Sequence, residues 1–268
     1  TVSLLETLPI RSIDFPQDGM FNPIVEAVRE SLMEQDLLPA EDRTFVSARN
    51  ARMTRSTDLR KLLSHDHLRV LLRTSDEVKW LSGEITQDRT PDLREFLSNK
   101  LSVADVEPPS FAGLVSADFL NGLDDEWFAS FYGFLDNQKS LWQPPKGVLR
   151  SKPIIRLENG SLVAPFDGSG NPNAYLPVER KVGFASVRRT IVSYQPALDF
   201  LKRLGLTQPD EIADVLEYVL PKYRSSEREN VSEEQYLADL QSIFGALKTD
   251  SEQKKRQLLE QVRSTPFV

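Results

Sequence analysis

Prolines divide this chain into short segments, and that division limits its fold more than any other feature of the sequence. The 268 residues include 17 prolines, which recur beside segments of helical spacing. Because proline has no backbone N–H and its ring clashes with the preceding turn, it starts or ends a helix more readily than it continues one. The longest apolar runs, such as Leu68–Leu72, are far too short to cross a bilayer. We therefore expect a fold of short helices without a membrane span.

Helices are expected where an apolar stripe of helical spacing follows a capping signal. In the first, Asn22 can cap the helix, Pro23 suits its first position, and Glu26 supplies a capping-box carboxylate. Gly205 and Pro221 are expected to end two later helices. The predicted helices cover residues 22–35, 58–64, 68–72, the surroundings of 78–81, 90–101, 110–122, 124–138, 196–204, 209–220, 232–247 and 250–263.

Two β-hairpins are expected between these helices. Residues 37–46 read as two short strands around a polar turn, and the strongest β signal lies in residues 152–177. There, Asn159-Gly160 tolerates the positive φ angles of a tight turn, and a further short strand is expected at residues 174–176. The predicted class is α+β, predominantly helical with short antiparallel β-hairpins.

Similar strings recur in the same order along the chain. Residues 42–46 resemble 159–163, since each is a polar turn followed by a β run. Residues 93–103 likewise resemble 197–206, and each of these is followed by a proline and another helix. The shared order is helix, hairpin, helix, short connector, helix. Stacked repeats commonly expose extended binding surfaces, although chance likeness between common helix and turn patterns is the alternative.

The repeat predicts two similar modules, residues 1–145 and 146–268, with the start of a third copy at residues 260–268. The chain begins with Thr1 instead of Met and ends on apolar, strand-like residues. Natural termini more often fray into polar residues. We therefore expect an internal segment of a longer protein.

Composition excludes several classes of protein. Hydrophobic residues at 40% and charged residues at 27% are typical of a globular chain and exclude disorder as its main state. The absence of cysteine excludes disulfides, thiolate metal sites and a cysteine nucleophile. No secretory signal is present, so a cytoplasmic location is expected. A net charge of −7 disfavours nucleic acid, which is bound by Lys and Arg that replace counterions.

One basic cluster stands against this acidic background. It is opposed in its span only by Asp58 and could contact phosphates or an acidic protein surface. Arg49, Arg52 and Arg55 would share one face if the segment were helical, while a solvated surface is the alternative. The candidate patch for an anionic partner comprises Arg43, Arg49, Arg52, Arg55, Arg60 and Lys61.

Other candidate sites favour ordinary structural roles. His65 and His67 could share a metal on a strand, but the region is predicted as helix or turn and offers no third ligand. The loop at residues 167–172 resembles a phosphate loop, yet it has no Lys and leads into a strand. Aromatic residues 127–134 lack the interleaved basic residues that base stacking needs, so they are expected in the core. No catalytic residue, cofactor or metal is assigned.

Several strings resemble the region after the ATPase domain in large sacsin-like bacterial proteins. These strings are residues 152–160, 175–177, 200–206, 220–223 and 236–240. Sacsin-like proteins carry an N-terminal ATP-binding domain of the gyrase, heat-shock-chaperone and histidine-kinase superfamily. The resemblance implies a parent that binds ATP and acts in a chaperone-like or regulatory manner. Residues 167–170 depart in spacing from that superfamily's Asp-x-Gly-x-Gly loop, and its Glu-x-x-x-Asn helix is missing, so no nucleotide-binding residue is carried over.

The leading hypothesis is a non-catalytic scaffold that binds other domains of its own polypeptide and protein partners. The alternative is a nucleic-acid accessory module that uses the patch from Arg43 to Lys61. A third hypothesis, a hydrolase, would require a polar pocket that the sequence does not indicate.

Overall fold

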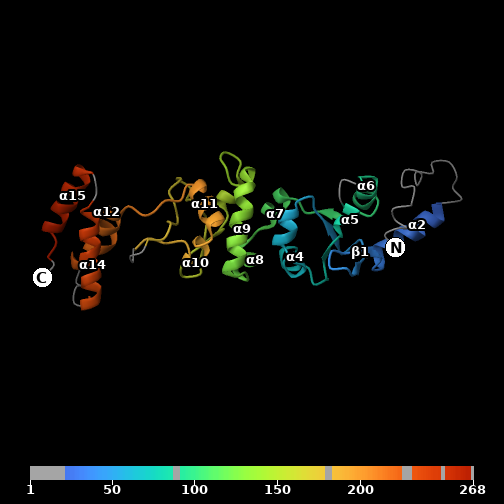
Figure 1. The fold of residues 1–268 in the computed structure, drawn as a ribbon, viewed down its shortest axis with the longest axis horizontal. Coiled ribbons are helices and arrows are strands. Elements are labelled where there is room, and N and C mark those ends of the chain that lie inside the picture. The colour runs from blue at the N-terminus through green and yellow to red at the C-terminus, as the bar shows by residue number, and fades with distance from the viewer. Residues whose placement is uncertain (1–21, 87–90, 179–182, 225–230, 249–250, 267–268) are drawn as a thin grey trace. The chain divides into compact units, whose positions relative to one another are not determined.

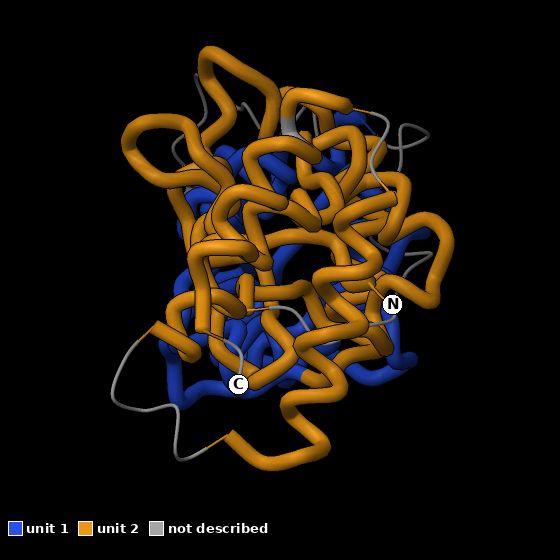
Figure 2. The backbone as a smooth tube through the Cα atoms, turned by 90° about the vertical axis from the view of Figure 1, so that its left-hand side faces the viewer, with its two compact units in different colours: residues 1–123 blue, residues 124–268 orange. Residues whose placement is uncertain are grey.

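A computed structural model describes residues 22–86, 91–178, 183–224, 231–248 and 251–266. The chain divides into two compact units, residues 1–123 and 124–268 (Figure 2). Helices dominate the described residues, and short strands pair between them (Figure 1). The predicted α+β, predominantly helical class is therefore confirmed.

The first unit opens on a helix and a hairpin, and three parallel strands then alternate with short helices. Capping explains where several helices begin: Ser56 and Ser64 accept backbone N–H groups at the starts of α3 and α4, and Ser116 does so at α8. Its elements are α2 (Asn22–Glu34), β1 (Leu38–Pro39), β2 (Phe45–Val46), β3 (Ala51–Met53), α3 (Thr57–Leu62), α4 (His65–Leu71), β4 (Lys79–Trp80), α5 (Gly83–Thr86), α6 (Pro91–Asn99), β5 (Ala104–Asp105), α7 (Pro108–Leu114) and α8 (Ala117–Asn121).

The strands of the first unit form two small sheets. β1 and β2 pair in an antiparallel hairpin, as expected. β3 lies at the centre of a parallel sheet in the order β4-β3-β5. The helix predicted around residues 78–81 is wrong, because this segment is β4: Leu81 N donates to Arg52 O at 2.8 Å and Lys79 N to Asn50 O at 3.1 Å.

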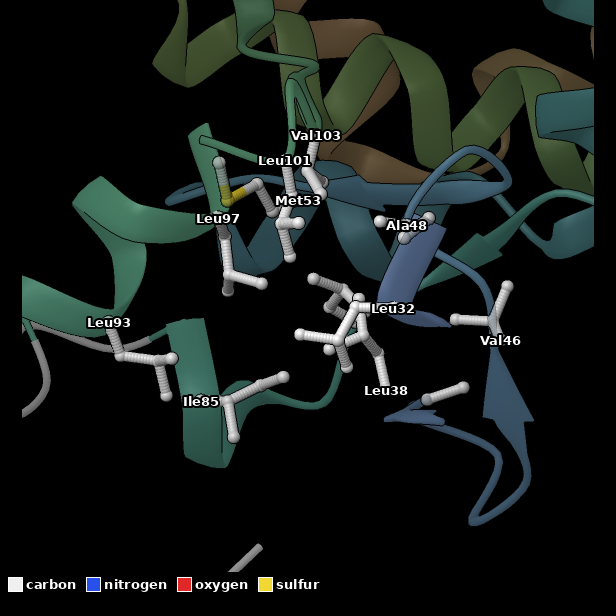
Figure 3. Close-up of a cluster of buried hydrophobic side chains, with 13 residues drawn as sticks. Leu32, Leu38, Val46, Ala48, Met53, Ile85, Leu93, Leu97, Leu101 and Val103 are labelled. Carbon is white, nitrogen blue, oxygen red and sulfur yellow. The ribbon is translucent and has the colours of Figure 1, made fainter. Parts of the chain in front are cut away.

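One apolar cluster packs around β3 in the first unit. It joins α2 and the hairpin to β3, α5 and α6, and Figure 3 shows these side chains pointing toward one another. Leu38, Met53 and Leu97 are completely buried, and each such side chain contributes about 1.5–3 kcal/mol relative to an exposed one. The buried members are Leu32, Leu38, Ala40, Val46, Ala48, Ala51, Met53, Leu81, Ile85, Leu93, Leu97, Leu101 and Val103.

The second unit begins with the aromatic helix and ends in a helical bundle. A hairpin with the expected Asn-Gly turn follows the aromatic helix, and Gly160 there has φ +86°. Its elements are α9 (Asp125–Asn137), η2 (Lys139–Leu141), η3 (Val148–Ser151), β6 (Ile155–Arg156), β7 (Leu162–Val163), α10 (Arg189–Val192), α11 (Gln195–Leu204), α12 (Glu211–Asp214), η4 (Val215–Val219), α13 (Leu220–Arg224), α14 (Glu233–Ala246) and α15 (Glu252–Arg263).

Aromatic packing on α9 and against α11 forms one part of the core of the second unit. The rings of Trp127 and Phe131 stack with centroids 4.9 Å apart, and Tyr132 meets Phe200 at 5.6 Å. All four are buried, so the predicted core role of the aromatic stretch is confirmed. α9 thus belongs with the second unit, although the sequence analysis placed residues up to 145 in the first module.

Pro221 does not end its helix, contrary to the sequence prediction. The helix continues from Glu211 to Arg224, and its π-helical turn η4 ends at Val219, two residues before Pro221. Proline lacks an N–H and clashes with the carbonyl four residues earlier. A π turn widens the helix at that carbonyl, and the chain passes through the proline without a break.

Two other predicted elements differ in detail. The helix expected over residues 110–122 is two helices, α7 and α8, and Pro108 and Pro109 begin α7. Residues 174–176 form no strand, although Tyr175 makes an isolated parallel bridge with Ser186. The last part of the predicted third copy, residues 267–268, lies outside the described residues.

The two units share a set of backbone pairings around their hairpins. In each unit, the hairpin's first strand pairs with a later segment, and that segment also pairs in parallel with the chain that follows the hairpin. In the first unit these pairs are Ala40–Leu81, Glu41–Trp80, Ser82–Pro39 and Leu81–Arg52. In the second unit the corresponding pairs, in the same order, are Leu157–Val187, Glu158–Ser186, Arg188–Arg156 and Val187–Tyr175. This agreement is what two copies of one module would show, with α2 and α9 as the helices that precede the hairpins.

Candidate functional site

The residues of the predicted basic patch are spread over several elements. Arg43 lies in the turn of the first hairpin, Arg49 and Arg55 flank β3, and Arg52 lies within it; Arg60 and Lys61 lie in α3. The segment is not helical, since Arg52 lies in the strand β3 while Arg49 and Arg55 lie outside any helix. The structure therefore does not align Arg49, Arg52 and Arg55 on one face.

Three of these arginines already bind neighbouring groups. Arg49 Nη2 lies 2.6 Å from Glu34 Oε1. Arg52 Nη1 donates to the carbonyls of Arg49 and Ala51 at 3.0 and 2.7 Å, and burial lowers the pKa of Arg52. Arg60 is largely buried and binds within the unit, as described below. Exposed side chains of the patch are those of Arg43, Arg49, Arg55 and Lys61.

The carboxyl ends of the three parallel strands lie at one edge of their sheet, which is where parallel α/β sheets bind ligands. Polar side chains gather at this edge in the first unit. They come from β5, α3, α5 and α6 and from the residues that follow β3 and β5. We call them the strand-end cluster: Thr54, Arg60, Thr86, Arg94, Asp105 and Glu107.

Arg94 lies at the centre of the strand-end cluster and is only 7% exposed. Its Nη1 donates to Thr86 O at 3.0 Å and its Nη2 to Asp105 Oδ1. The same Nη2 lies 3.7 Å from Glu107 Oε1, which also accepts the Arg55 N–H at 2.7 Å. A buried guanidinium is tolerated because carboxylates and a carbonyl replace its water. No local sequence signal identifies this residue.

Arg60 binds the other side of the strand-end cluster. Its Nη2 donates to Thr54 O at 3.0 Å and to Thr86 Oγ1 at 3.4 Å, and its Nε lies 3.8 Å from Glu41 Oε2. With Glu41 included, two guanidinium groups meet three carboxylates. The strand-end cluster itself carries two positive and two negative side chains, and the adjacent Glu41 makes this edge net negative and unsuited to a phosphate. These contacts tie the hairpin, β5 and the helices together.

In the second unit, Asp125 contacts three donors from two segments, the second hairpin and the start of α10. Arg188 Nε lies 2.6 Å from its Oδ2, and Thr190 Oγ1 donates to the same oxygen at 2.6 Å. Arg156 Nε lies 3.4 Å from Oδ1, and its guanidinium lies 5.0 Å from the ring centroid of Phe128. We call Asp125, Arg156, Arg188 and Thr190 the Asp125 brace, because they hold the second hairpin and α10 against α9.

A buried hydroxyl adds a second link between α9 and this hairpin. Tyr132 Oη donates to Ile154 O at 2.8 Å and accepts the Arg156 N–H at 3.0 Å. Burial raises the pKa of Tyr132 far above its ordinary value. The hydroxyl thus keeps its proton at neutral pH and serves as a structural donor.

The two histidines do not converge on a shared site. His67 closes a capping box, since its N–H donates to Ser64 Oγ at 3.2 Å and its Nδ1 accepts the Ser64 N–H at 3.3 Å. His65 Nδ1 lies 3.7 Å from Asp42 Oδ2. Within the described part of the chain, no three His, Asp or Glu side chains are grouped as metal ligands would be.

Asp167 folds its loop upon itself. Its Oδ1 accepts the N–H groups of Ser169 and Asn171, both at 2.8 Å, and its Oδ2 accepts from Asn171 Nδ2 at 3.0 Å. The hydrogen bonds from Asn171 hold the pKa of Asp167 below its usual value. These N–H groups are the donors that a bound phosphate would need, but they already donate to the Asp167 carboxylate, whose negative charge would repel a phosphate. The surface-turn interpretation agrees with this geometry.

Apolar side chains on two helices are exposed instead of buried. Ile24 and Val28 on α2 are 61% and 45% exposed, and Leu237 and Phe244 on α14 are 53% and 64% exposed. Each pair shares a helix face because its members are four or seven residues apart. Exposed apolar faces are typical of surfaces that receive another protein. In the sequence, the four- and seven-residue spacings indicate that the two side chains of each pair share a helix face, but they do not indicate whether that face is buried or exposed.

Comparisons of this chain with protein families, with curated proteins and with solved structures gave no match. Among helices in the described ranges, none is long and apolar enough to cross a membrane.

Proposed function

We propose that this chain is a non-catalytic scaffold that binds protein partners and neighbouring domains within a larger cytoplasmic protein. The larger protein would be an ATP-dependent chaperone-like or regulatory protein. The resemblance to the region after the ATPase domain of sacsin-like proteins supports this context. The shared pairings of the two units support a modular scaffold, because repeated modules offer extended binding surfaces.

One observation carries the non-catalytic part of this proposal. At the edge where a parallel sheet would bind a ligand, the charged side chains of the strand-end cluster bind one another. Arg94 is held by Asp105 and Glu107, and Arg60 by a carbonyl and a hydroxyl. A catalytic site needs groups that remain available to a substrate, and these groups instead connect structural elements.

Isothermal titration of the chain with Mg·ATP tests this reading. We expect no heat of binding beyond dilution, because no nucleotide-binding residue is carried over and the Asp167 loop turns a carboxylate toward its own amides. Saturable heat with micromolar affinity would end the proposal. The ATP-dependent context is tested separately: the same reading frame should encode an ATP-binding domain of the superfamily named above, and a frame encoding a different enzyme would refute it.

Nucleic-acid binding through the basic patch is the alternative function. The described contacts weaken it, because Arg49 is paired with Glu34 and Arg52 is directed to backbone carbonyls. Arg43, Arg55 and Lys61 are the exposed cations of the patch without an ion pair to a described carboxylate.

Fluorescence anisotropy with a labelled RNA or DNA oligonucleotide, measured at several salt concentrations, tests this alternative. The scaffold proposal predicts weak binding that charge reversal at Arg43, Arg55 and Lys61 changes no more than the control reversal. The control reverses Lys139, Lys146 and Lys202, which are exposed in the second unit. Steeply salt-dependent binding that only the first triple variant abolishes would favour the nucleic-acid function.

A further inference from the structure

Exposed side chains lie along one face of α14, the helix of residues Glu233–Ala246. Leu237 and Phe244 are 53% and 64% exposed, and Glu233 and Lys248 at the two ends are also exposed. At 100° per residue, Glu233, Leu237 and Phe244 fall within about 40° of arc, and Lys248 lies in the turn just past the end of α14. We call Glu233, Leu237, Phe244 and Lys248 the α14 stripe.

The opposite face of α14 supplies the core of the helical bundle. Ile243 and Ala246 are buried there against α12, η4 and α15. Asp239 is buried on the same side, where Lys222 Nζ, Tyr223 Oη and Gln235 Nε2 donate to its carboxylate at 2.9–3.2 Å. Packing within the unit therefore accounts for the inner face of the helix and leaves the α14 stripe to be explained.

The order of side chains in the α14 stripe is self-complementary. A two-fold axis through the midpoint between residues 240 and 241 places Leu237 level with Phe244 of a second copy. The same axis places Glu233 level with Lys248 of that copy, at both ends of the pair. We propose that the chain associates with a second copy of itself through antiparallel α14 helices. The interface would be isologous, which is the commonest arrangement in homodimers.

The charges at the two ends of the α14 stripe favour a second copy of the chain in the antiparallel orientation. A parallel pair would set Glu233 against Glu233 and Lys248 against Lys248, and like charges at one level repel. In the antiparallel pair, each end carries an opposite-charge contact, and apolar side chains cover one another between the ends. The inference does not depend on the proposed scaffold function, because a catalytic protein could associate in the same way.

The expected association is weak. α14 has 14 residues and is thus about 21 Å long. One helix pair buries less than the roughly 1,200–2,000 Å² of a standard stable interface. We therefore expect a monomer–dimer equilibrium that shifts with concentration, and ion pairs at the rim that weaken as salt is added.

Sedimentation equilibrium of the whole chain across a concentration series tests the proposal. Leu237→Glu and Phe244→Glu should each weaken dimerisation about tenfold or more, because each places a charge at the centre of the pair. Val148→Glu is the matched control, since Val148 is 49% exposed in the same unit. Circular dichroism of every variant checks that the fold is unchanged.

A charge exchange tests the direction of the pair. At low salt, Glu233→Lys alone should weaken dimerisation about twofold to fivefold, as exposed ion pairs do. Adding Lys248→Glu to that variant should restore it. The proposal fails if the chain stays monomeric at every concentration, if the glutamate variants dimerise like the control, or if the exchanged pair fails to restore association.

Discussion

Replacement of Tyr132 by phenylalanine removes one hydroxyl from the interior of the second unit. That hydroxyl donates to Ile154 O at 2.8 Å and accepts the Arg156 N–H at 3.0 Å. The ring should keep its contacts with Phe128 and Phe200, whose centroids lie 6.0 and 5.6 Å away. The substitution thus isolates the hydrogen bonds that link α9 to the second hairpin.

The expected loss of stability follows from the two groups that lose their partner. A buried backbone group left without a hydrogen bond costs about 1–3 kcal/mol. Ile154 is completely buried, so its carbonyl should carry most of that cost. Arg156 is only partly buried, and water can reach it at a lower cost. We therefore expect Tyr132→Phe to lower the free energy of unfolding of the second unit by about 2–4 kcal/mol.

Hydrogen exchange followed by mass spectrometry can localise this effect. A loss of 2–4 kcal/mol corresponds to roughly 30-fold to 900-fold faster exchange where amides exchange through opening of the unit. The peptides to follow cover residues 125–137 and 153–163. Tyr194→Phe is the control, because Tyr194 is 49% exposed and loses the same atom. Exchange in Tyr132→Phe within twofold of this control would refute the reasoning.

Two further substitutions test the strand-end cluster and a helix end. In urea unfolding, Arg94→Met should destabilise the first unit by about 2–3 kcal/mol, because it leaves two partly exposed carboxylates without their cation. The control Arg49→Met, at an exposed ion pair, should cost less than about 1 kcal/mol. Equal losses in the two variants would contradict a structural role for the strand-end cluster. Gly205→Ala should lower the stability by about 1–2 kcal/mol in thermal unfolding, because residue 205 has φ +110° and a Cβ there would lie 3.3 Å from the Phe166 ring. The control Gly168→Ala, whose Cβ would meet open space, should be neutral. A neutral Gly205→Ala would show that α11 does not need a left-handed residue at its C-terminal end.

The hairpins could be predicted from the sequence because their turns carry local signals. Asn159-Gly160 supplies the positive φ that its turn requires, and Gly160 has φ +86°. In the first hairpin, Asp42 Oδ1 accepts the Thr44 N–H at 3.0 Å, which is the usual Asx turn. Such bonds span two residues, so neighbouring letters of the sequence are sufficient to indicate them.

Other features could not be predicted because they depend on distant partners. β4 has two residues, too few for any periodicity, and becomes a strand only because β3 lies beside it. Pro221 was expected to stop a helix, and the π turn before it has no sequence signature known to us. Arg94 finds Asp105 across eleven positions, and nothing in its neighbours distinguishes it from a solvated arginine.

Comparison of the two units argues that the strand-end cluster has a structural role. The string similarity that aligns residues 93–97 with 197–201 sets Arg94 against Leu198. The second unit keeps the backbone pairings of the first, yet the position of its central guanidinium holds an apolar side chain. Its hairpin is held instead by the Asp125 brace, which is built on α9. If both units bound a common ligand at this edge, the charged side chains should recur together with the backbone pairings. Only the backbone pairings recur, so each unit uses different side chains to hold a similar backbone arrangement together.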